Sequence, residues 1–407
     1  MTSIGDEAFC DCESLTSVII PDSVTSIGYL AFYGCNGLSD KDGFVIIKGV
    51  LYDYFGKAES ITIPGNVTSI GDWTFRCESL ASVIIPDSVT SIGNWAFYGC
   101  ENLTSVIIPD SVTSIGYLAF AGCDGLSDKD GFVIIKGVLY YYSGKTESVT
   151  IPDGVTSIGD GAFCDCECLT SVIIPDGVTS IGDGAFSGCK SLTSVIIPDS
   201  VTSIGYGAFS GCKSLTSVII PDSVTSIGDE AFYGCKGLSD KDGFVIIRGV
   251  LYDYFGKAES ITIPDSVSII GNGAFCGCKS LASVIIPDSV TSIGIWAFYG
   301  CNGLSDKDGF VIIRGVLYSY SGKAESITIP DGVTSIGDRA FRGCKSLASV
   351  IIPDSVKIIR NGAFAECDSL NKVVYYGTED SFKQIEMDDD TRSTIAPLVK
   401  YKEKPLS

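Results

Sequence analysis

Apolar residues recur along this chain at a regular interval, and the most visible marker of the interval is an Ile-Pro pair. Successive marker prolines lie 23 residues apart, or 43 where the unit is lengthened by 20, with a single gap of 22. They are Pro21, Pro64, Pro86, Pro109, Pro152, Pro175, Pro198, Pro221, Pro264, Pro287, Pro330 and Pro353. A repeat of this length predicts a solenoid, because each unit is too small to form a core alone.

One unit, Leu192–Ser214, shows which positions are apolar. Its sequence is LTSVIIPDSVTSIGYGAFSGCKS, and eight of its positions are apolar in nearly every unit. These are Leu192, Val195, Ile197, Val201, Ile204, Ala208, Phe209 and Cys212. A unit of 23 residues cannot bury them by itself, so we expect them to face a core that the neighbouring coils complete.

The same unit predicts two short strands and a turn. Ser194–Ile197 is rich in β-branched residues and ends at Pro198, which suits a strand. Val201–Ile204 is a second extended segment, and Ala208–Cys212 is expected on a helical or irregular turn. Stacked coils would place equivalent strands in parallel, about 4.8 Å apart, with columns of Phe, Ile and Cys along the axis.

The four lengthened units share an insertion with the pattern of a β-hairpin. In the first, which begins at Gly37, the apolar runs Phe44–Ile47 and Val50–Tyr54 flank Lys48-Gly49. The glycine supplies the positive φ that a tight hairpin turn needs. The other insertions begin at Gly125, Gly237 and Gly303. We expect the hairpins to be elaborations of the coil, not separate domains.

The repeat pattern L-x-x-V-x-I-P-x-x-V-x-x-I-G-x-x-A-F-x-x-C resembles the BspA-like class of leucine-rich repeats, found in bacterial and protist surface proteins. The motif recurs thirteen times and covers about nine-tenths of the chain. The resemblance implies a mainly β repeat solenoid, right-handed, of 23-residue coils with four long coils that carry β-hairpins. For function it implies adhesion or protein binding, and it carries no catalytic residues over to this chain.

Two divisions of the chain are expected. Residues 1–373 are predicted to form the solenoid, and residues 374–407 a C-terminal capping segment and tail. The segment Val374–Thr378 and the polar stretch after it look like the terminal unit that closes bacterial members of the family. Met1 occupies the position of Val201 in the unit above, so we expect the N-terminal cap of the solenoid to be missing.

Composition narrows the function. With 28 Lys and Arg against 49 Asp and Glu, the net charge is −21, which argues against binding nucleic acid phosphates. The chain has no His, so Ser-His-Asp and Cys-His catalysis and two-His zinc sites cannot be built from it. No apolar run approaches the roughly 20 residues of a membrane-spanning helix. We therefore predict no nucleic acid partner, no membrane span and no cofactor.

Cysteine is abundant, with 17 residues, and thirteen of them follow the repeated Phe by three positions, or by two after Phe75. We expect this column to be buried, because free Cys behaves as a small apolar residue. The remaining cysteines are Cys10, Cys164, Cys168 and Cys276. Cys164, Cys166 and Cys168 form C-x-C-x-C, but only Cys166 belongs to the column and no fourth ligand is apparent, so no metal site is predicted.

Acidic residues recur in two patterns, and both are interpreted as turns. Asp-Lys-Asp-Gly begins at Asp40, Asp128, Asp240 and Asp306, and it resembles part of an EF-hand loop without the Glu that such a loop requires. An Asp also follows each marker proline, except where Gly65 replaces it. Because these carboxylates repeat in every coil and do not converge in one cleft, we expect no acid–base site.

The outward positions of the first strand carry a row of isoleucines. We predict that a protein partner contacts Ile84, Ile107, Ile173, Ile196, Ile219, Ile285 and Ile351. An exposed apolar stripe with polar neighbours is typical of a binding surface, although β-branched neighbours also stabilise a parallel ladder. Residues of varied size follow the Gly of the second segment, including Trp73, Trp95 and Trp296, and these could contact a partner or pack against the hairpins.

The leading hypothesis is a non-enzymatic, monomeric protein-binding or adhesion module. The family resemblance places it on the cell surface or outside the cell, where its partner could be an extracellular-matrix or host cell-surface protein. One alternative is a carbohydrate-active or other enzyme that uses carboxylates, which would need a unique pair in a cleft. A second is an ice- or surface-binding protein, but the Thr column that includes Thr179 and Thr202 lacks the second Thr column of a regular lattice.

Overall fold

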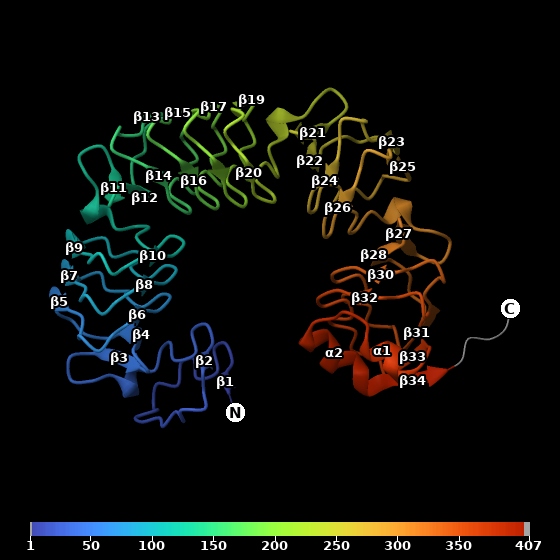
Figure 1. Ribbon diagram of the computed structural model, residues 1–407, viewed down its shortest axis with the longest axis horizontal. Helices are drawn as coiled ribbons and strands as arrows, with labels where there is room; N and C mark the ends of the chain where they lie inside the picture. The colour runs from blue at the N-terminus through green and yellow to red at the C-terminus, as the bar shows by residue number, and fades with distance from the viewer. Residues whose placement is uncertain (1, 403–407) are drawn as a thin grey trace. The chain divides into compact units, whose positions relative to one another are not determined.

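A computed structural model describes residues 2–402, and this part of the chain divides into two compact units after Gly237 (Figure 1). Each unit is a stack of short coils, as the 23-residue period predicts. The predicted place of Met1 and the last five residues of the predicted tail lie outside the described residues. The fold class predicted from the sequence, a mainly β repeat solenoid, is confirmed.

A regular coil contains two short strands joined by turns. In the coil of Leu192–Ser214 these strands are β17 (Ser194–Ile196) and β18 (Ser203–Ile204). Between them the chain turns at Pro198, whose carbonyl oxygen accepts a hydrogen bond from Val201 N at 3.0 Å. All eight positions predicted to face the core are buried. The segment after the second strand forms turns and no helix.

The first strands of successive coils pair in parallel and form what we call the first ladder. Its register follows the repeat, with Ser194 opposite Ser217 and Ile196 opposite Ile219. Its strands in the first unit are β5 (Ser60–Thr62), β7 (Ser82–Ile84), β9 (Ser105–Ile107), β13 (Ser148–Thr150), β15 (Ser171–Ile173), β17 and β19 (Ser217–Ile219). In the second unit they are β23 (Ser260–Thr262), β25 (Ser283–Ile285), β29 (Ser326–Thr328) and β31 (Ser349–Ile352).

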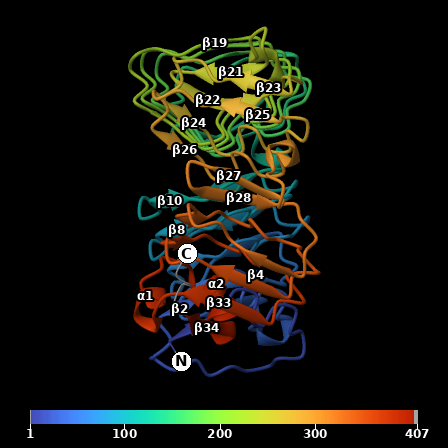
Figure 2. The same cartoon turned by 90° about the vertical axis from the view of Figure 1, so that its right-hand side faces the viewer.

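The second strands pair in the same way and form the second ladder. In the first unit they are β1 (Ser3–Ile4), β2 (Ser26–Ile27), β6 (Ser69–Ile70), β8 (Ser91–Ile92), β10 (Ser114–Ile115), β14 (Ser157–Ile158), β16 (Ser180–Ile181), β18 and β20 (Ser226–Ile227). In the second unit they are β24 (Ile269–Ile270), β26 (Ser292–Ile293), β30 (Ser335–Ile336) and β32 (Ile358–Ile359). Figure 2 shows β22, β24 and β26 along one side of the second unit, with β23 and β25 along the other.

Each insertion forms the predicted hairpin. The hairpins are β3 (Phe44–Ile47) with β4 (Val50–Tyr54), β11 (Phe132–Ile135) with β12 (Val138–Tyr142), β21 (Phe244–Ile247) with β22 (Val250–Tyr254), and β27 (Phe310–Ile313) with β28 (Val316–Tyr320). Lys48 and Gly49 take φ values of 49° and 82°, which is typical of a two-residue type I′ turn.

The insertions change both ladders. The second hairpin strand joins the second ladder, with Val50 opposite Ser69 and Leu51 opposite Ile70. Each insertion is therefore one further coil of the solenoid. It supplies no strand to the first ladder, which restarts after it as separate sheets such as β5-β7-β9 and β13-β15-β17-β19. The first ladder is interrupted at each insertion because the antiparallel hairpin replaces the first strand in these coils.

The core is a stack of aromatic rings. Phe186 and Phe209 stack with centroids 5.2 Å apart and planes 1° apart, and other regular neighbours pack likewise. Hairpin tyrosines continue the stack where no Phe is present, with Tyr52 at 5.5 Å from Phe32 and Tyr54 at 5.6 Å from Phe75. Phe is buried throughout the column except at Phe9, which is half-buried.

The C-terminal segment packs onto the last coils. It contains β33 (Lys372–Tyr376), α1 (Glu379–Lys383), α2 (Asp389–Ile395) and β34 (Val399–Lys402). Short 3-10 helices occur at η1 (Asn36–Leu38), η2 (Asp124–Leu126), η3 (Lys236–Leu238), η4 (Asn302–Leu304) and η5 (Ala396–Leu398). Phe382, Ile385 and Ile395 are buried in the core of the preceding coils. The boundary predicted at residue 374 falls within β33 and stays a prediction.

Candidate functional site on the two ladder faces

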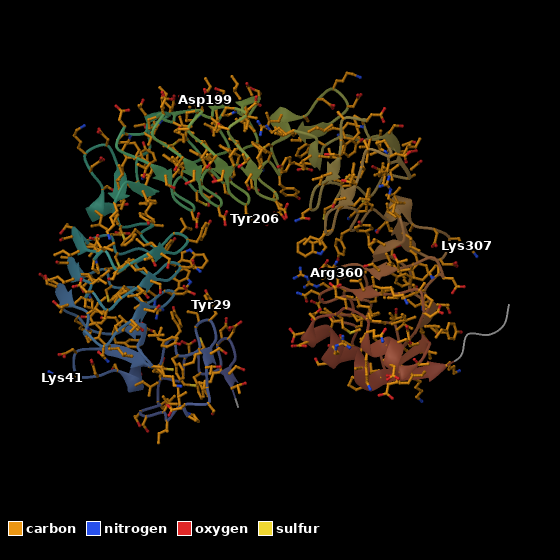
Figure 3. The ribbon with its side chains drawn as sticks, viewed as in Figure 1. Tyr29, Lys41, Asp199, Tyr206, Lys307 and Arg360 are labelled. Carbon is orange, nitrogen blue, oxygen red and sulfur yellow. The ribbon has the colours of Figure 1, made fainter. Side chains whose placement is uncertain are left out.

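The outward isoleucines of the first ladder are exposed, as the alternation in these strands predicts. Their exposed fraction ranges from 42% at Ile84 to 65% at Ile196, and only Ile351 is half-buried. Each has an outward Ser two residues earlier in the same strand. Asp199 and Tyr206, on opposite sides of one coil in Figure 3, mark the edges that belong to the first and the second ladder. The predicted row is therefore accessible to a partner.

The isoleucine row is divided into short patches. Each sheet of the first ladder begins with a Thr at the outward position, for example Thr150, which lies opposite Ile173. The longest patch is the run Ile173, Ile196 and Ile219 in the first unit, which we call the Ile173 patch. The turn that follows each of these strands carries an exposed Asp, as at Asp199. An apolar patch with an acidic edge results.

The face of the second ladder in the first unit carries an aromatic cluster. Trp73 and Trp95 stack with centroids 5.2 Å apart, Tyr98 lies 5.3 Å from Trp73, and Tyr117 lies 5.5 Å from Trp95. Trp73 Nε1 also donates a hydrogen bond to the Tyr29 hydroxyl at 3.2 Å. The variable residues after the repeat Gly thus pack mainly on one another in neighbouring coils.

These large residues occupy a left-handed backbone position. Trp73, Trp95 and Trp296 have φ between 50° and 56°. Five other coils have glycine at this position, at Gly161, Gly184, Gly207, Gly273 and Gly362. A non-glycine residue in this conformation costs about 1–2 kcal/mol relative to the right-handed region. The other coils carry Glu7, Leu30, Leu118, Glu230 or Arg339 there, so the fold accepts a side chain at this position in most coils.

A column of Asp and Asn side chains supports this position. Asp72 Oδ1 accepts a hydrogen bond from Asn94 N, and Asn94 Oδ1 accepts one from Tyr117 N at 2.8 Å. Asp183 Oδ1 accepts one from Tyr206 N at 2.7 Å. Partial burial raises the pKa of Asp72 above its ordinary value. These side chains join successive coils and do not form a catalytic pair.

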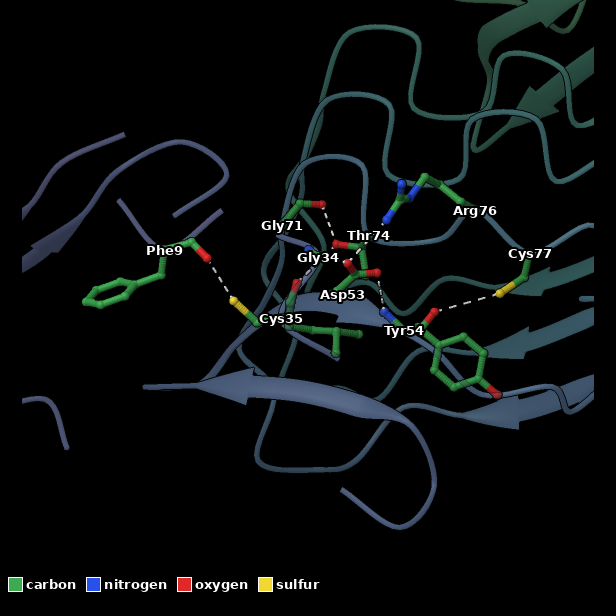
Figure 4. A network of polar contacts seen from close by, with 10 residues as sticks. Phe9, Gly34, Cys35, Asp53, Tyr54, Gly71, Thr74, Arg76 and Cys77 are labelled. Atoms are coloured by element: carbon green, nitrogen blue, oxygen red, sulfur yellow. Dashed lines mark hydrogen bonds and ion pairs between the residues drawn. The ribbon is translucent and has the colours of Figure 1, made fainter. Parts of the chain in front are cut away.

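A buried carboxylate lies in the first hairpin coil and connects three coils (Figure 4). Asp53 is 1% exposed, accepts hydrogen bonds from Gly34 N at 3.0 Å and Tyr54 N at 2.8 Å, and pairs with Arg76 at 3.4 Å. Arg76 also lies over the Tyr33 ring, 4.1 Å from its centroid. Burial raises the pKa of Asp53, although the backbone amides and Arg76 act in the opposite direction. Its partners are all within the solenoid, so its role is structural.

The cysteine column is only partly buried, which corrects the sequence expectation. Cys212 and six other members are buried, but Cys12 is exposed and the rest are half-buried. In regular coils the thiol lies close to the Phe carbonyl of the coil before, as Cys212 Sγ does to Phe186 O at 3.1 Å. Cys77 follows a hairpin coil, and its Sγ lies 3.9 Å from Tyr54 O. The hairpin coil has no equivalent Phe-Cys turn, so it covers the following Cys less well.

The acidic motifs form turns. Asp40 Oδ1 accepts hydrogen bonds from Asp42 N at 2.9 Å and Phe44 N at 3.0 Å, and the other three Asp-Lys-Asp-Gly segments repeat this geometry. The predicted turn that leads into each hairpin is confirmed. Among residues 2–402, no group of three or more His, Cys, Asp or Glu side chains could hold a metal ion. No helix in this range is long and apolar enough to cross a membrane.

Two hollows beside the hairpins were not predicted from the sequence. One, about 390 Å³, is lined by residues that include Tyr29, Tyr52 and Asp72, and the other, about 130 Å³, by residues that include Trp296 and Asp338. Sequence periodicity does not show that a hairpin coil leaves space between its neighbours. The sequence does mark the second hollow at one position. Arg360, which lines this hollow, replaces the Gly that follows the second strand in the other regular coils.

The stacked coils with parallel strands and a Leu, Ile and Phe core define a leucine-rich-repeat solenoid. A protein-family model described as the BspA type leucine-rich repeat region, which contains six copies of the repeat, matches residues 2–127, 133–242, 246–308 and 311–388 of this chain. The chain belongs to this family, as its repeat pattern predicts.

Several solved structures are similar to the chain. A leucine-rich cell surface protein from Faecalibacterium prausnitzii A2-165 is 36% identical, over 86% of this chain and 96% of that one, with a TM-score of 0.42. A leucine-rich repeat protein from Bacteroides ovatus ATCC 8483 is 28% identical, over 99% and 87%, with a TM-score of 0.31. One from Eubacterium ventriosum ATCC 27560 is 24% identical, over 81% and 74%, with a TM-score of 0.35. A search of curated proteins finds no match.

Proposed function

We propose that this chain is a non-enzymatic protein-binding or adhesion module of a cell-surface or secreted protein. The observation that carries the proposal is the exposed isoleucine row of the first ladder. Exposed β-branched residues in register leave an apolar surface that a partner can cover. Family membership supports the same role, and a similar protein from Faecalibacterium prausnitzii is described as a cell surface protein.

The Ile173 patch is the part of the row best suited to a partner. Its three isoleucines are each more than half exposed and lie on adjacent parallel strands. The exposed Asp residues of the following turns, among them Asp176 and Asp199, give the patch an acidic edge. We therefore expect a protein partner with a basic surface, an extracellular-matrix or host cell-surface protein, and faster association at low salt.

The test compares two variants with the same added charge in the same coils. One changes Ile173, Ile196 and Ile219 to Lys. The control changes exposed residues of the Thr column to Lys, namely Thr179, Thr202 and Thr225. The chain itself has Lys357 in this column, with the regular backbone hydrogen bond to Thr334 O, so the control substitutions suit the fold.

The measurement is binding of the purified, folded chains to cultured cells and to immobilised extracellular-matrix proteins. We expect the isoleucine variant to lose most binding and the threonine control to keep it. If the isoleucine variant binds as well as the parent, the first ladder is not the binding surface. If the parent binds none of these targets, the adhesion proposal fails.

A further inference from the structure

A third hollow lies where the first ladder restarts after the second hairpin. Its volume is about 910 Å³, and it lies beside β13, the first strand of its sheet (Figure 1). Its lining includes β13 itself, the Asp-Lys-Asp-Gly turn that begins at Asp128, and the segment Tyr142–Gly144 that leaves the hairpin. Ligand pockets in proteins have volumes of about 300–1,000 Å³, so this hollow is large enough for a ligand. We call it the β13 slot.

The backbone of β13 has an open edge in this slot. Ile151 N donates a hydrogen bond to Ile173 O at 3.0 Å, so the odd-numbered residues of this segment face the next coil. Successive residues of a strand direct their N–H and C=O groups to opposite sides. Ser148 and Thr150 therefore direct theirs toward the slot, and β13 has no strand partner on that side among residues 2–402.

Part of this edge is satisfied within the coil itself. Thr146 Oγ1 donates a hydrogen bond to Ser148 O at 3.0 Å and lies 2.8 Å from the Tyr142 hydroxyl. The backbone groups left open in the described chain are the N–H of Ser148 and both the N–H and the C=O of Thr150. An extended peptide can pair with such an edge as one further strand.

One position of the repeat distinguishes the hairpin coils from one another. Ser143 lines the β13 slot, whereas Phe55 and Phe255 occupy the equivalent position in the first and third hairpin coils and are half-buried there. The fourth hairpin coil has Ser321. Phe55 packs against the core of the coil before it. A serine at this position therefore leaves free the space that a phenyl ring takes in the first hairpin coil.

The side chains around the slot are mainly acidic. Asp124, Asp128 and Asp130 line it, and Lys129 is the basic side chain of the same turn. Lys129 Nζ already pairs with Asp130 Oδ2 at 2.6 Å. Asp124 and Asp128 are exposed. This surplus of carboxylates favours a ligand with Lys or Arg side chains.

The place of the slot in the stack favours a single strand over a second folded copy of the chain. The open edge faces the hairpin coil of the same unit, and the Asp-Lys-Asp-Gly turn also lines the slot. One extended segment can enter beside β13, whereas a whole coil of a second copy would have to displace the turn. Thr150 also lies opposite Ile173, so an added strand would extend the sheet that carries the Ile173 patch.

We propose that the β13 slot binds an extended, basic segment of a protein partner as an added β-strand. The open N–H and C=O groups of Ser148 and Thr150 pair with the backbone of this segment, and its Lys or Arg side chains lie near the carboxylates of the slot. Pairing through the backbone does not require the isoleucine row, so this site can be tested by itself.

The probe is a fluorescent octapeptide of alternating Lys and Val, and its binding to the full chain is measured by fluorescence anisotropy at about 0.15 M salt. One comparison peptide replaces every Lys with Glu. Two others carry N-methyl groups on the valine amides or on the lysine amides. Each pattern of methylation removes the N–H donors from one edge of the extended peptide and keeps its charge.

Two variants close the slot. Thr150→Pro removes an open N–H, and proline is tolerated in an edge strand where the N–H faces away from the sheet. Ser143→Phe fills the space with the residue of the first and third hairpin coils and leaves the net charge unchanged. Thr62→Pro is the matched control, because Thr62 has the same place in β5, the strand after the first hairpin, where Phe55 occupies the position of Ser143.

We expect the Lys-Val peptide to bind the parent and Thr62→Pro equally. Thr150→Pro and Ser143→Phe should each raise its dissociation constant roughly tenfold, because the peptide loses backbone hydrogen bonds or the space it occupies. At least one of the two methylated peptides should lose binding to a similar degree, and the Glu-Val peptide should not bind.

Several results would overturn the proposal. These are no binding of the Lys-Val peptide to the parent, full binding of both methylated peptides, full binding by the folded Thr150→Pro and Ser143→Phe variants, or an equal loss in Thr62→Pro. Sedimentation of the parent tests the other occupant, since a dimer that Thr150→Pro separates into monomers would show that a second copy of the chain takes the slot.

Discussion

At the scale of single residues, polar columns in this chain serve the backbone of the neighbouring coil. The Thr column shows this, because Thr179 Oγ1 donates to Thr156 O at 3.0 Å and Thr202 Oγ1 donates to Thr179 O at 3.2 Å. These bonds join successive coils in addition to the pairing of the short strands and the stacking of the Phe rings. The same hydroxyls that suggested an ice-binding surface in the sequence thus have a structural use.

Asp53 provides a pH-dependent prediction at this scale. Burial raises its pKa above the ordinary value of 3.8, so the folded state binds the proton more tightly than the unfolded state does. The contribution of Asp53 to stability is therefore greatest at low pH and falls as pH rises from the ordinary value through the raised pKa. As pH rises from about 4 to about 8, the thermal midpoint of the parent should therefore fall relative to the thermal midpoint of Asp53→Asn.

The variant reports the titration of one group, because all other carboxylates are common to both chains. Replacing the carboxylate also leaves Asn Nδ2 facing the Gly34 or Tyr54 amide, which adds a destabilisation that does not vary with pH. A difference that stays constant across the range, or moves in favour of the parent as pH rises, would contradict the expected direction of the pKa.

At the scale of elements, the hairpin turn explains why a basic residue precedes its glycine. Lys48 Nζ donates to Pro21 O at 3.0 Å and Val24 O at 2.8 Å in the coil before. Arg314 makes the same pair of contacts with Pro287 O and Val290 O in the second unit. The turn residue therefore fastens the hairpin to the proline turn of the preceding coil, which the hydrophobic pattern alone does not indicate.

Gly49→Ala should destabilise the first hairpin coil. Gly49 has a φ of 82°, and a Cβ atom there would lie 2.8 Å from Thr68 Oγ1. We expect a loss of about 1–2 kcal/mol, since the left-handed backbone disfavours any side chain and the contact adds to the cost. Hydrogen exchange of the hairpin amides measures the loss.

Gly65→Ala is the control for this prediction. Gly65 lies in the next proline turn, where a Cβ atom would meet nothing within 4 Å, and its φ is outside the left-handed range. This change should leave stability unchanged or raise it slightly, by about 0.4–1 kcal/mol, because it restricts the unfolded chain. Equal effects of the two substitutions would show that the turn conformation does not require glycine.

At the scale of the whole molecule, the four hairpins divide each ladder face into segments. The exposure of the cysteine side chains varies along the chain with this division. Reaction with maleimide requires an accessible thiolate. Cys168 and Cys276 are exposed, Cys77 and Cys278 are half-buried after a hairpin coil, and Cys212 is buried within regular coils. Burial also raises the pKa of Cys212 to about 12.

Labelling of the native chain, followed by peptide mass spectrometry, should therefore proceed in that order. Cys168 and Cys276 should react first, Cys77 and Cys278 more slowly, and Cys212 only when the chain is unfolded by denaturant. Labelling in denaturant is the control, where all five should react at similar rates. Native labelling of Cys212 as fast as Cys168 would contradict the stacked core.

The sequence by itself determined the period, the eight apolar positions that face the core, the hairpins and the outward isoleucines, because a repeat of short strands places equivalent residues in equivalent surroundings. Tertiary structure alone decided what happens where a regular coil meets a hairpin coil. There the first ladder restarts, Cys77 is less well covered, Asp53 is buried, and a hollow lined by Trp296 and Asp338 remains beside the last hairpin. These features depend on contacts between coils of different length, and periodicity within one coil carries no information about them.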